Sequence, residues 1–421
     1  MKTIKNDILS MNYQILKHKS GLTMCLMPLK DYSSVYAIFG TDYGSVDTAF
    51  KLKGEENILE VPEGIAHFLE HKLFENEECD AFERYAKTGA SANAYTSFDK
   101  TCYLFKCADK FPESLEILLD FVTHPYFTEQ TVKKEQGIIG QEIKMYEDSP
   151  EWRVFFNTLG AMYHKNPVKI DIAGTTESIA QIDKDLLYRC YNTFYNLNNM
   201  VLCVVGNFST EDVLTVADKV LTEAPDCEII RGTADEPDEI VEKEVVQKLP
   251  VALPLFNIGF KETPPKKDDV LKNKIICELL EELICGETSE LYKEMYNSAL
   301  INSTFSYESF SSKDSFAAFF SGESKEPRKV KEKLIEKINE MKKNGIDENS
   351  FLTAKKLMLG RYIRSFNSVE NIGNSMVSLY FEGKSVFAPV DVLYGITIED
   401  LEEYMKKGFD ENRSVISIVE K

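Results

Sequence analysis

The sequence predicts an α+β protein with two related domains. At 421 residues the chain is too long for one ordinary core, and the usual domain size suggests two or three domains. Short alternating strand patterns are interspersed with segments of helical periodicity. A loop, a helix, an Asn-containing turn and a closing strand occur in this order at 178–205 and again at 395–419. We therefore expect that one α+β unit has been duplicated, although chance similarity of common elements is the alternative.

The first half opens with strands and continues with helices. Alternating residues predict short strands at 13–16, 24–27 and 35–39, and a hairpin around 97–100. Helical periodicity predicts helices at 65–73, 111–121, 129–146 and 184–194, and a buried strand at 200–205. These elements form the predicted N-terminal domain, residues 1–227.

Residues 228–248 form the predicted linker, because this segment is acidic and shows little of the apolar periodicity of buried elements. Beyond it, a strand at 255–260 and a helix at 268–284 open the predicted C-terminal domain, residues 249–421.

Composition and charge exclude several classes of function. The 69 acidic and 49 basic side chains give a net charge of −20, which would repel nucleic acid. No apolar run approaches the roughly 18 residues that span a bilayer, and the N-terminus lacks a signal-peptide pattern. The nine cysteines are scattered without a C-x-x-C pair. We therefore expect a cytoplasmic protein that binds neither membrane nor nucleic acid.

The segment His67-Phe68-Leu69-Glu70-His71 reads H-x-x-E-H, the inverted form of a zinc-peptidase motif. Positions four apart share a helix face, so both imidazoles can reach one ion, and Glu70 lies on the same side. A carboxylate there can act as general base toward water. The alternative is a helix that carries two surface or core histidines.

A catalytic zinc site needs a third protein ligand. The candidates are Glu135, Glu142, Glu147 and His164. Glu135 and Glu142 are seven residues apart and face the same way on a helix, so either could bind the ion while the other orients a ligand. Spacing does not choose between them. The donor set suits Zn²⁺ best but would also accept manganese or cobalt.

Three segments in this order, GIAHFLEHKLF, GASANAYTSF and EQGIIGQE, resemble the pitrilysin/insulinase family of zinc peptidases. The chain is most similar to the bacterial branch that resembles mitochondrial processing peptidase subunits. The resemblance implies an α/β sandwich in each domain, with an antiparallel-rich mixed sheet of about six strands packed against helices. It covers residues 35–210 well and the second half loosely.

The resemblance also implies roles for individual residues. His67, His71 and Glu142 match the family's zinc ligands, Glu70 matches its general base, and Glu135 matches the acidic residue that supports the site. The family's substrate-binding strand corresponds to Asn93, Ala94, Tyr95 and Thr96, which would pair with the backbone of an extended peptide. Asn93 could instead only stabilise a turn.

One departure from the family concerns the second half. Active members carry an Arg and a Tyr seven positions apart, but here Tyr296 stands where the Arg is expected and Asn302 or Ser303 where the Tyr is expected. We therefore expect a zinc metalloendopeptidase that hydrolyses extended oligopeptides as the zinc-bearing subunit of a heterodimer, with a related subunit supplying the Arg/Tyr pair. The alternatives are a catalytically weak peptide-binding or assembly subunit and a dedicated maturation peptidase for one gene-encoded peptide.

Overall fold

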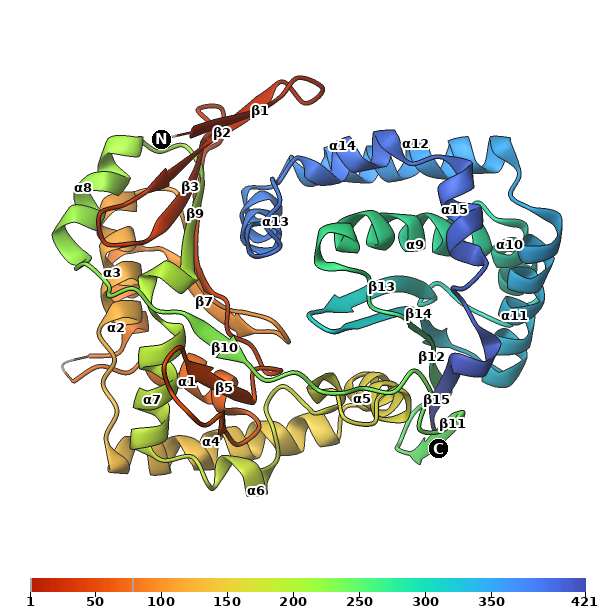
Figure 1. Cartoon of the computed structure of the whole chain (residues 1–421), viewed down its shortest axis with the longest axis horizontal. Coiled ribbons are helices and arrows are strands. Elements are labelled where there is room, and N and C mark those ends of the chain that lie inside the picture. The colour runs from red at the N-terminus through yellow and green to blue at the C-terminus, as the bar shows by residue number, and fades with distance from the viewer. Residues whose placement is uncertain (1, 78) are drawn as a thin grey trace. The chain divides into compact units, whose positions relative to one another are not determined.

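The computed structural model describes residues 2–77 and 79–421, which form two compact units (Figure 1). Unit 1 comprises the chain up to Ile143, Asp171–Gly232 and Ile363–Phe387, and unit 2 comprises Lys144–Ile170, Thr233–Tyr362 and Ala388–Lys421. Each unit contains a mixed sheet covered by helices, which confirms the predicted α+β class. No helix within the described ranges is long and apolar enough to cross a membrane.

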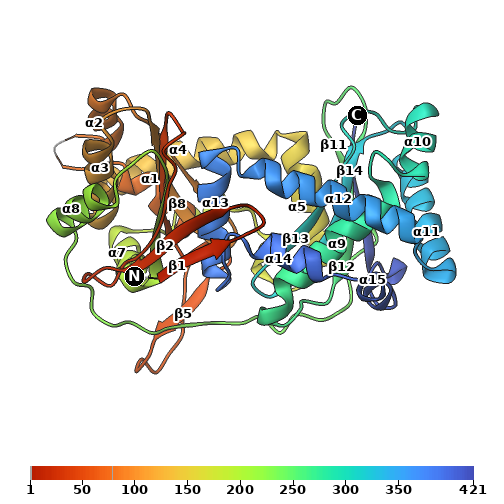
Figure 2. The ribbon, with the colours of Figure 1, turned by 90° about the horizontal axis from the view of Figure 1, so that it is seen from above.

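The main sheet of unit 1 has seven strands in the order β1-β2-β3-β9-β4-β8-β7. The strands are β1 (Lys2–Asn6), β2 (Met11–Lys17), β3 (Thr23–Pro28), β4 (Val35–Thr41), β7 (Ser91–Thr96), β8 (Thr101–Cys107) and β9 (Met200–Gly206). All neighbours are antiparallel except β3 and β9. The hairpin β1–β2 forms one edge (Figure 2) and β7 forms the other. A small second sheet consists of β10 (Ile229–Arg231), β5 (Ala49–Leu52) and β6 (Leu59–Glu60).

Helices cover both faces of the seven-stranded sheet. Tyr103 of β8 packs against Phe121 of α3 on one face, with ring centroids 5.7 Å apart. Alternate residues such as Ile38 and Cys203 point to the other face and form a buried cluster with α13 (Figure 1). The helices of unit 1 are α1 (Ile65–Leu73), α2 (Ala81–Thr88), α3 (Phe111–Thr123), most of α4 (Glu129–Glu147), α6 (Thr176–Ile179), α7 (Lys184–Phe194), α8 (Thr210–Val220), α13 (Val369–Phe381) and the 3₁₀ turn η2 (Leu197–Asn199).

Unit 2 has a five-stranded sheet in the order β11-β15-β12-β14-β13. The strands are β11 (Glu244–Lys248), β12 (Leu255–Glu262), β13 (Ser306–Ser312), β14 (Ser315–Glu323) and β15 (Ser414–Glu420), and only β11 and β15 are parallel. The helices are α5 (Pro150–Met162), α9 (Val270–Cys285), α10 (Glu290–Asn297), α11 (Pro327–Asn344), most of α12 (Glu348–Ser365), α14 (Ala388–Gly395) and α15 (Ile398–Met405), with the 3₁₀ turns η1 (Pro167–Lys169), η3 (Lys267–Asp269) and η4 (Glu411–Arg413). Helix α5 packs on β12 and β15.

The two sheets share one topology. Numbered by their order in the sequence, β3, β4, β7, β8 and β9 of unit 1 lie in the order 1-5-2-4-3, and the five strands of unit 2 lie in the same order with the same directions. This agreement supports the predicted duplication.

Each unit also contains a helix from the other half of the sequence. Helix α5, from the first half, packs on the unit 2 sheet, and α13, from the second half, packs on the unit 1 sheet. Consequently, no single cut in the chain divides it into these units. An amphipathic pattern predicts that a helix buries one face, but it does not specify which sheet that face covers.

The predicted linker, residues 228–248, contains regular structure that its composition did not indicate. Strand β10 pairs with β5, and β11 pairs with β15. Between these two strands, the carboxylate of Glu236 forms an ion pair with the buried Nζ atom of Lys261 at 2.7 Å. Both strands lie at sheet edges, where charged side chains are common and the core pattern is weak.

Candidate metal centre

The H-x-x-E-H motif lies on α1, which begins directly after Gly64. Gly64 has a φ of 85°, and a Cβ at this position would lie 2.3 Å from the carbonyl oxygen of Ala173, so the start of the helix requires glycine. His67 and His71 are one helical turn apart, and their ring centroids are 4.5 Å apart. Both imidazoles therefore lie on one face of α1.

Helix α4 brings a carboxylate to these two histidines. The Oε1 atom of Glu142 lies 3.7 Å from His67 Nε2, and its Oε2 atom lies 3.3 Å from His71 Nε2. One ligand atom from each of the three residues lies within 4.8 Å of the others. Two imidazoles and one carboxylate are a donor set of three-ligand catalytic zinc sites, so these residues fit a zinc ion.

Glu135, two turns before Glu142 on α4, contacts the other nitrogen of His71. The Nδ1 atom of His71 and Oε1 of Glu135 are 2.9 Å apart, and the glutamate is 9% exposed. Because the carboxylate accepts the Nδ1 proton, Nε2 of His71 is directed toward Glu142. Such a carboxylate partner fixes the orientation of a metal-binding histidine and makes it more basic.

The two histidines have different proton affinities. Burial, together with the charge of His71, lowers the pKa of His67 to about 4, so His67 is neutral at neutral pH. Burial opposes the charged form of His71, but its hydrogen bonds to Glu135 and Glu142 outweigh burial and raise its pKa to about 10. A metal ion that binds Nε2 of His71 must therefore displace a proton.

Glu70 lies between the two histidines in the sequence, and its carboxylate accepts a hydrogen bond from a side chain of strand β7. Burial raises the pKa of Glu70, whereas a hydrogen bond from the Thr96 hydroxyl to its Oε2 atom, 2.6 Å long, acts in the opposite direction. A carboxylate in such an environment can accept a proton near neutral pH.

Strand β7 carries the four residues predicted to bind substrate. Thr96 reaches Glu70, while Tyr95 points to the opposite face and donates its hydroxyl proton to Asn374 of α13 at 2.9 Å. The exposed Asn93 accepts a hydrogen bond from the backbone N–H of Ala94 at 2.9 Å. The contact of Thr96 with Glu70 was not anticipated, although the period of two along a strand places Ala94 and Thr96 on one face.

The two remaining ligand candidates do not belong to the group of three. Glu147 is exposed at the C-terminal end of α4. His164 belongs to unit 2, where its backbone N–H donates to Glu236 at 2.9 Å.

Helix α9 takes the place of α1 in unit 2 but carries glutamates instead of histidines. Glu278 accepts a hydrogen bond from Tyr362 at 3.0 Å, and Glu282 is paired with Arg361 at 2.9 Å. In the described part of the chain, His67, His71 and Glu142 form the only His/Cys/Asp/Glu group close enough to hold a metal ion.

Two family models match successive parts of the chain. Residues 59–176 match the family model described as insulinase (peptidase family M16), and residues 181–358 match the model described as the peptidase M16 inactive domain. A protein of Bacillus subtilis (strain 168) named "Uncharacterized zinc protease YmfH" is 40% identical over 411 residues, which cover 95% of this chain and 94% of the relative. The chain belongs to peptidase family M16. It is a protease of this family.

A solved structure and a more distant relative extend the comparison. The crystal structure of an M16-like peptidase from Alicyclobacillus acidocaldarius has a TM-score of 0.93 and 33% identity, covering 97% of this chain and 98% of that chain. The mitochondrial-processing peptidase subunit beta of Caenorhabditis elegans is 28% identical over 183 residues, which cover 42% of this chain and 39% of the relative.

Proposed function

We propose that this M16 protease is a zinc metalloendopeptidase that hydrolyses extended oligopeptides. The convergence of His67, His71 and Glu142 is the observation that supports this proposal most directly. These three residues would hold the ion. The bound zinc ion would act as a Lewis acid toward the scissile carbonyl and lower the pKa of a water molecule.

Glu70 is the proposed proton carrier. It lies one residue before His71 on α1, and burial raises its pKa toward the range in which it both accepts and releases protons. It would take a proton from the attacking water and pass it to the leaving amine. Thr96 would hold the Glu70 carboxylate in place, and Glu135 would hold the ring of His71.

The substrate would bind along β7. This strand forms one edge of the unit 1 sheet, and residues 93–96 lie on it. An extended peptide can add to such an edge through main-chain hydrogen bonds, which place little demand on its sequence. Thr96 would bring the peptide next to Glu70, because the same residue belongs to the strand and contacts the carboxylate.

We further propose that a related subunit completes the site. The expected Arg position is occupied by Tyr296, which stacks on Tyr292 with ring centroids 5.8 Å apart. The expected Tyr position is occupied by Asn302 or Ser303, and Asn302 donates to Glu323 at 2.8 Å. The positive charge is therefore missing from the first position of the family pair, and the phenol is missing from the second. One relative is named as a subunit of a processing peptidase, which supports a two-chain assembly.

The test of Glu70 is the variant Glu70→Gln. Because the amide cannot accept the proton, peptide cleavage should fall by about 10²- to 10⁴-fold while zinc content stays at the wild-type level. Glu83→Gln, at an exposed position of α2, is the matched control and should retain activity. Cleavage by Glu70→Gln at the wild-type rate would contradict the proposed role.

The test of the partner is to assay the chain alone and after co-purification with a related chain that carries the Arg/Tyr pair. We expect activity to rise strongly in the mixture. Full activity of the lone chain would contradict the proposed heterodimer and leave the role of Glu70 untouched.

A further inference from the structure

Strand β11 leaves one edge of the unit 2 sheet open (Figure 1). It pairs with β15 on one side, and within residues 2–77 and 79–421 no strand pairs with its other side. The corresponding strand of unit 1 is β3, the first in the shared order 1-5-2-4-3. There the outer side is covered, because β2 pairs with β3 in the antiparallel direction. The duplicated fold therefore accepts an antiparallel strand at this position, and the described part of unit 2 does not supply one.

The main-chain groups on the open side of β11 belong to alternate residues. The carbonyl oxygen of Lys243 accepts a hydrogen bond from β15 at 3.0 Å, and the N–H of Leu249 donates to β15 at 3.0 Å. Because the direction of these groups alternates along a strand, the N–H and C=O groups of Glu244, Val246 and Lys248 point away from β15. Such a row of unpaired groups is a template for pairing with another chain.

The side chains of the same three residues form a pattern that complements itself. Glu244, Val246 and Lys248 lie on one face of the strand and are exposed, and Val246 at the centre is 41% exposed. When two copies of β11 run antiparallel with Val246 opposite Val246, Glu244 of each copy faces Lys248 of the other. In this register each facing pair also exchanges both main-chain hydrogen bonds, because all three residues direct these groups outward.

Both charged residues already have a partner within unit 2. Arg328 is paired with Glu244 at 2.6 Å, and Lys248 is paired with Glu420 at 2.7 Å. Ion pairs between exposed side chains contribute little to stability. A carboxylate also has several acceptor positions and an ammonium group has three donors, so each residue retains capacity for a second partner of opposite charge.

We propose that β11 is a docking edge for a second copy of this chain. The two copies of β11 pair antiparallel about Val246 and join the two unit 2 sheets into one continuous sheet. The occupant is another copy of the chain because the order of charges along β11 complements itself in this register. The strand is short, so the strand contact alone buries less than the roughly 1,600 Å² of a standard interface, and we expect a weak dimer that depends on concentration.

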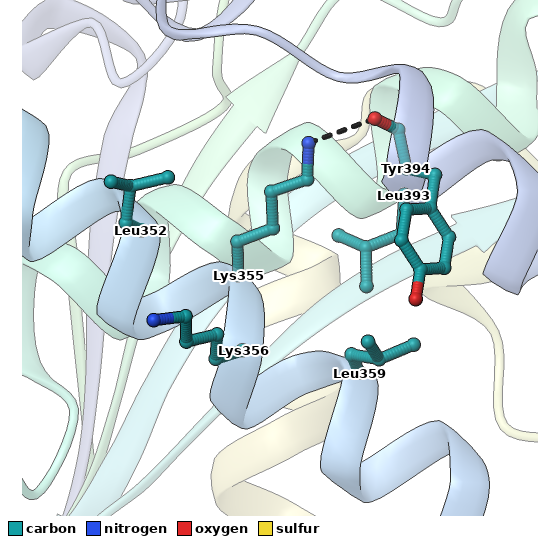
Figure 3. Close-up of a pocket in the computed structure, with 6 residues that line it drawn as sticks. All are labelled: Leu352, Lys355, Lys356, Leu359, Leu393 and Tyr394. Carbon is teal, nitrogen blue, oxygen red and sulfur yellow. Dashed lines mark hydrogen bonds between the residues drawn. The ribbon is translucent and has the colours of Figure 1, made fainter.

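An apolar cavity of about 150 Å³ between α12 and α14 offers no such template (Figure 3). Lys355 lines this cavity and donates to the carbonyl oxygens of Tyr394 at 2.9 Å and Ile396 at 2.6 Å. The polar group of the cavity is therefore satisfied by the fold itself. The outward groups of β11 differ in this respect, because no strand in the described part of the chain pairs with them.

The test is sedimentation equilibrium of the full-length chain over a range of concentrations. We expect the mean mass of the wild type to rise from that of one chain toward that of two. Val246→Pro removes an outward N–H and keeps the hydrogen bonds to β15, so it should abolish self-association at an unchanged melting temperature. A wild type that remains a single chain up to about 0.3 mM, or a Val246→Pro variant that self-associates like the wild type, would overturn the proposal.

Charge variants test the register and the identity of the occupant. Glu244→Lys places lysines opposite each other and Lys248→Glu places glutamates opposite each other, so each variant alone should self-associate about tenfold to a hundredfold more weakly. An equal mixture of the two variants restores opposite charges at every facing pair and should recover wild-type association. Glu332→Gln, at an exposed position of α11, is the control and should associate like the wild type. A mixture that associates no more strongly than either variant alone would overturn the proposed pairing.

Discussion

Replacing Thr96 by valine removes the hydroxyl that donates to Glu70 and keeps the shape of the side chain. The hydrogen bond is 2.6 Å long and favours the ionised carboxylate, whereas burial disfavours it. A hydrogen bond to a charged group contributes about 1.5–3 kcal/mol, and one pKa unit corresponds to about 1.4 kcal/mol. Because Thr96 is half-buried and water can partly replace it, we expect the pKa of Glu70 to rise by about one unit.

The pH profile of kcat/KM measures this change. Glu70 must be ionised to accept a proton, so a higher pKa moves the acidic limb of the profile upward by about one pH unit in Thr96→Val. Well above that limb, kcat/KM should match the wild type. Thr96→Ser keeps the hydroxyl and should keep the wild-type limb. Coincident profiles for Thr96→Val and the wild type, or an equal shift in Thr96→Ser, would refute the reasoning.

Two further variants test the role of Glu135 in zinc binding and the pH dependence of stability in unit 2. Glu135→Gln should lower zinc affinity about 10- to 100-fold in a chelator competition, because the charged partner of His71 is lost. Glu147→Gln, exposed on the same helix, should not change it, and equal losses in both would refute the role of Glu135. Burial raises the pKa of Glu262 to about 7, so the wild type should lose about 3 kcal/mol of stability as the pH rises from about 4.5 to 7. Urea unfolding of Glu262→Gln should lack this loss, and a wild-type pH dependence in that variant would contradict the pKa assignment.

The candidate site could be predicted from the sequence because each of its parts lies within a short segment of the chain. The helix that carries His67 and His71 follows from periodicity, and it is observed as α1. The seven-residue spacing of Glu135 and Glu142 placed both on one face of α4 but left their roles open. Only the position of α4 next to α1 shows which glutamate lies between the two Nε2 atoms and which contacts Nδ1.

Features that depend on distant parts of the chain could not be predicted in this way. The predicted domain boundary at residues 228–248 does not account for the placement of α5 and α13. The sequence of a helix shows that one of its faces is buried, but it does not show which sheet that face packs against.

The placement of α13 affects the order in which the protein can fold during synthesis. The last strand of the unit 1 sheet ends at Gly206, but the helix that covers one face of this sheet begins at Val369, 163 residues later. At a synthesis rate of about 5–20 residues per second, roughly 8–30 seconds pass between the synthesis of Gly206 and that of Val369. Until α13 has been made, Cys203 and its apolar neighbours on the same sheet face have no helix packed on them. During this interval the nascent chain exposes an apolar sheet face, so aggregation and chaperone binding compete with folding until α13 leaves the ribosome.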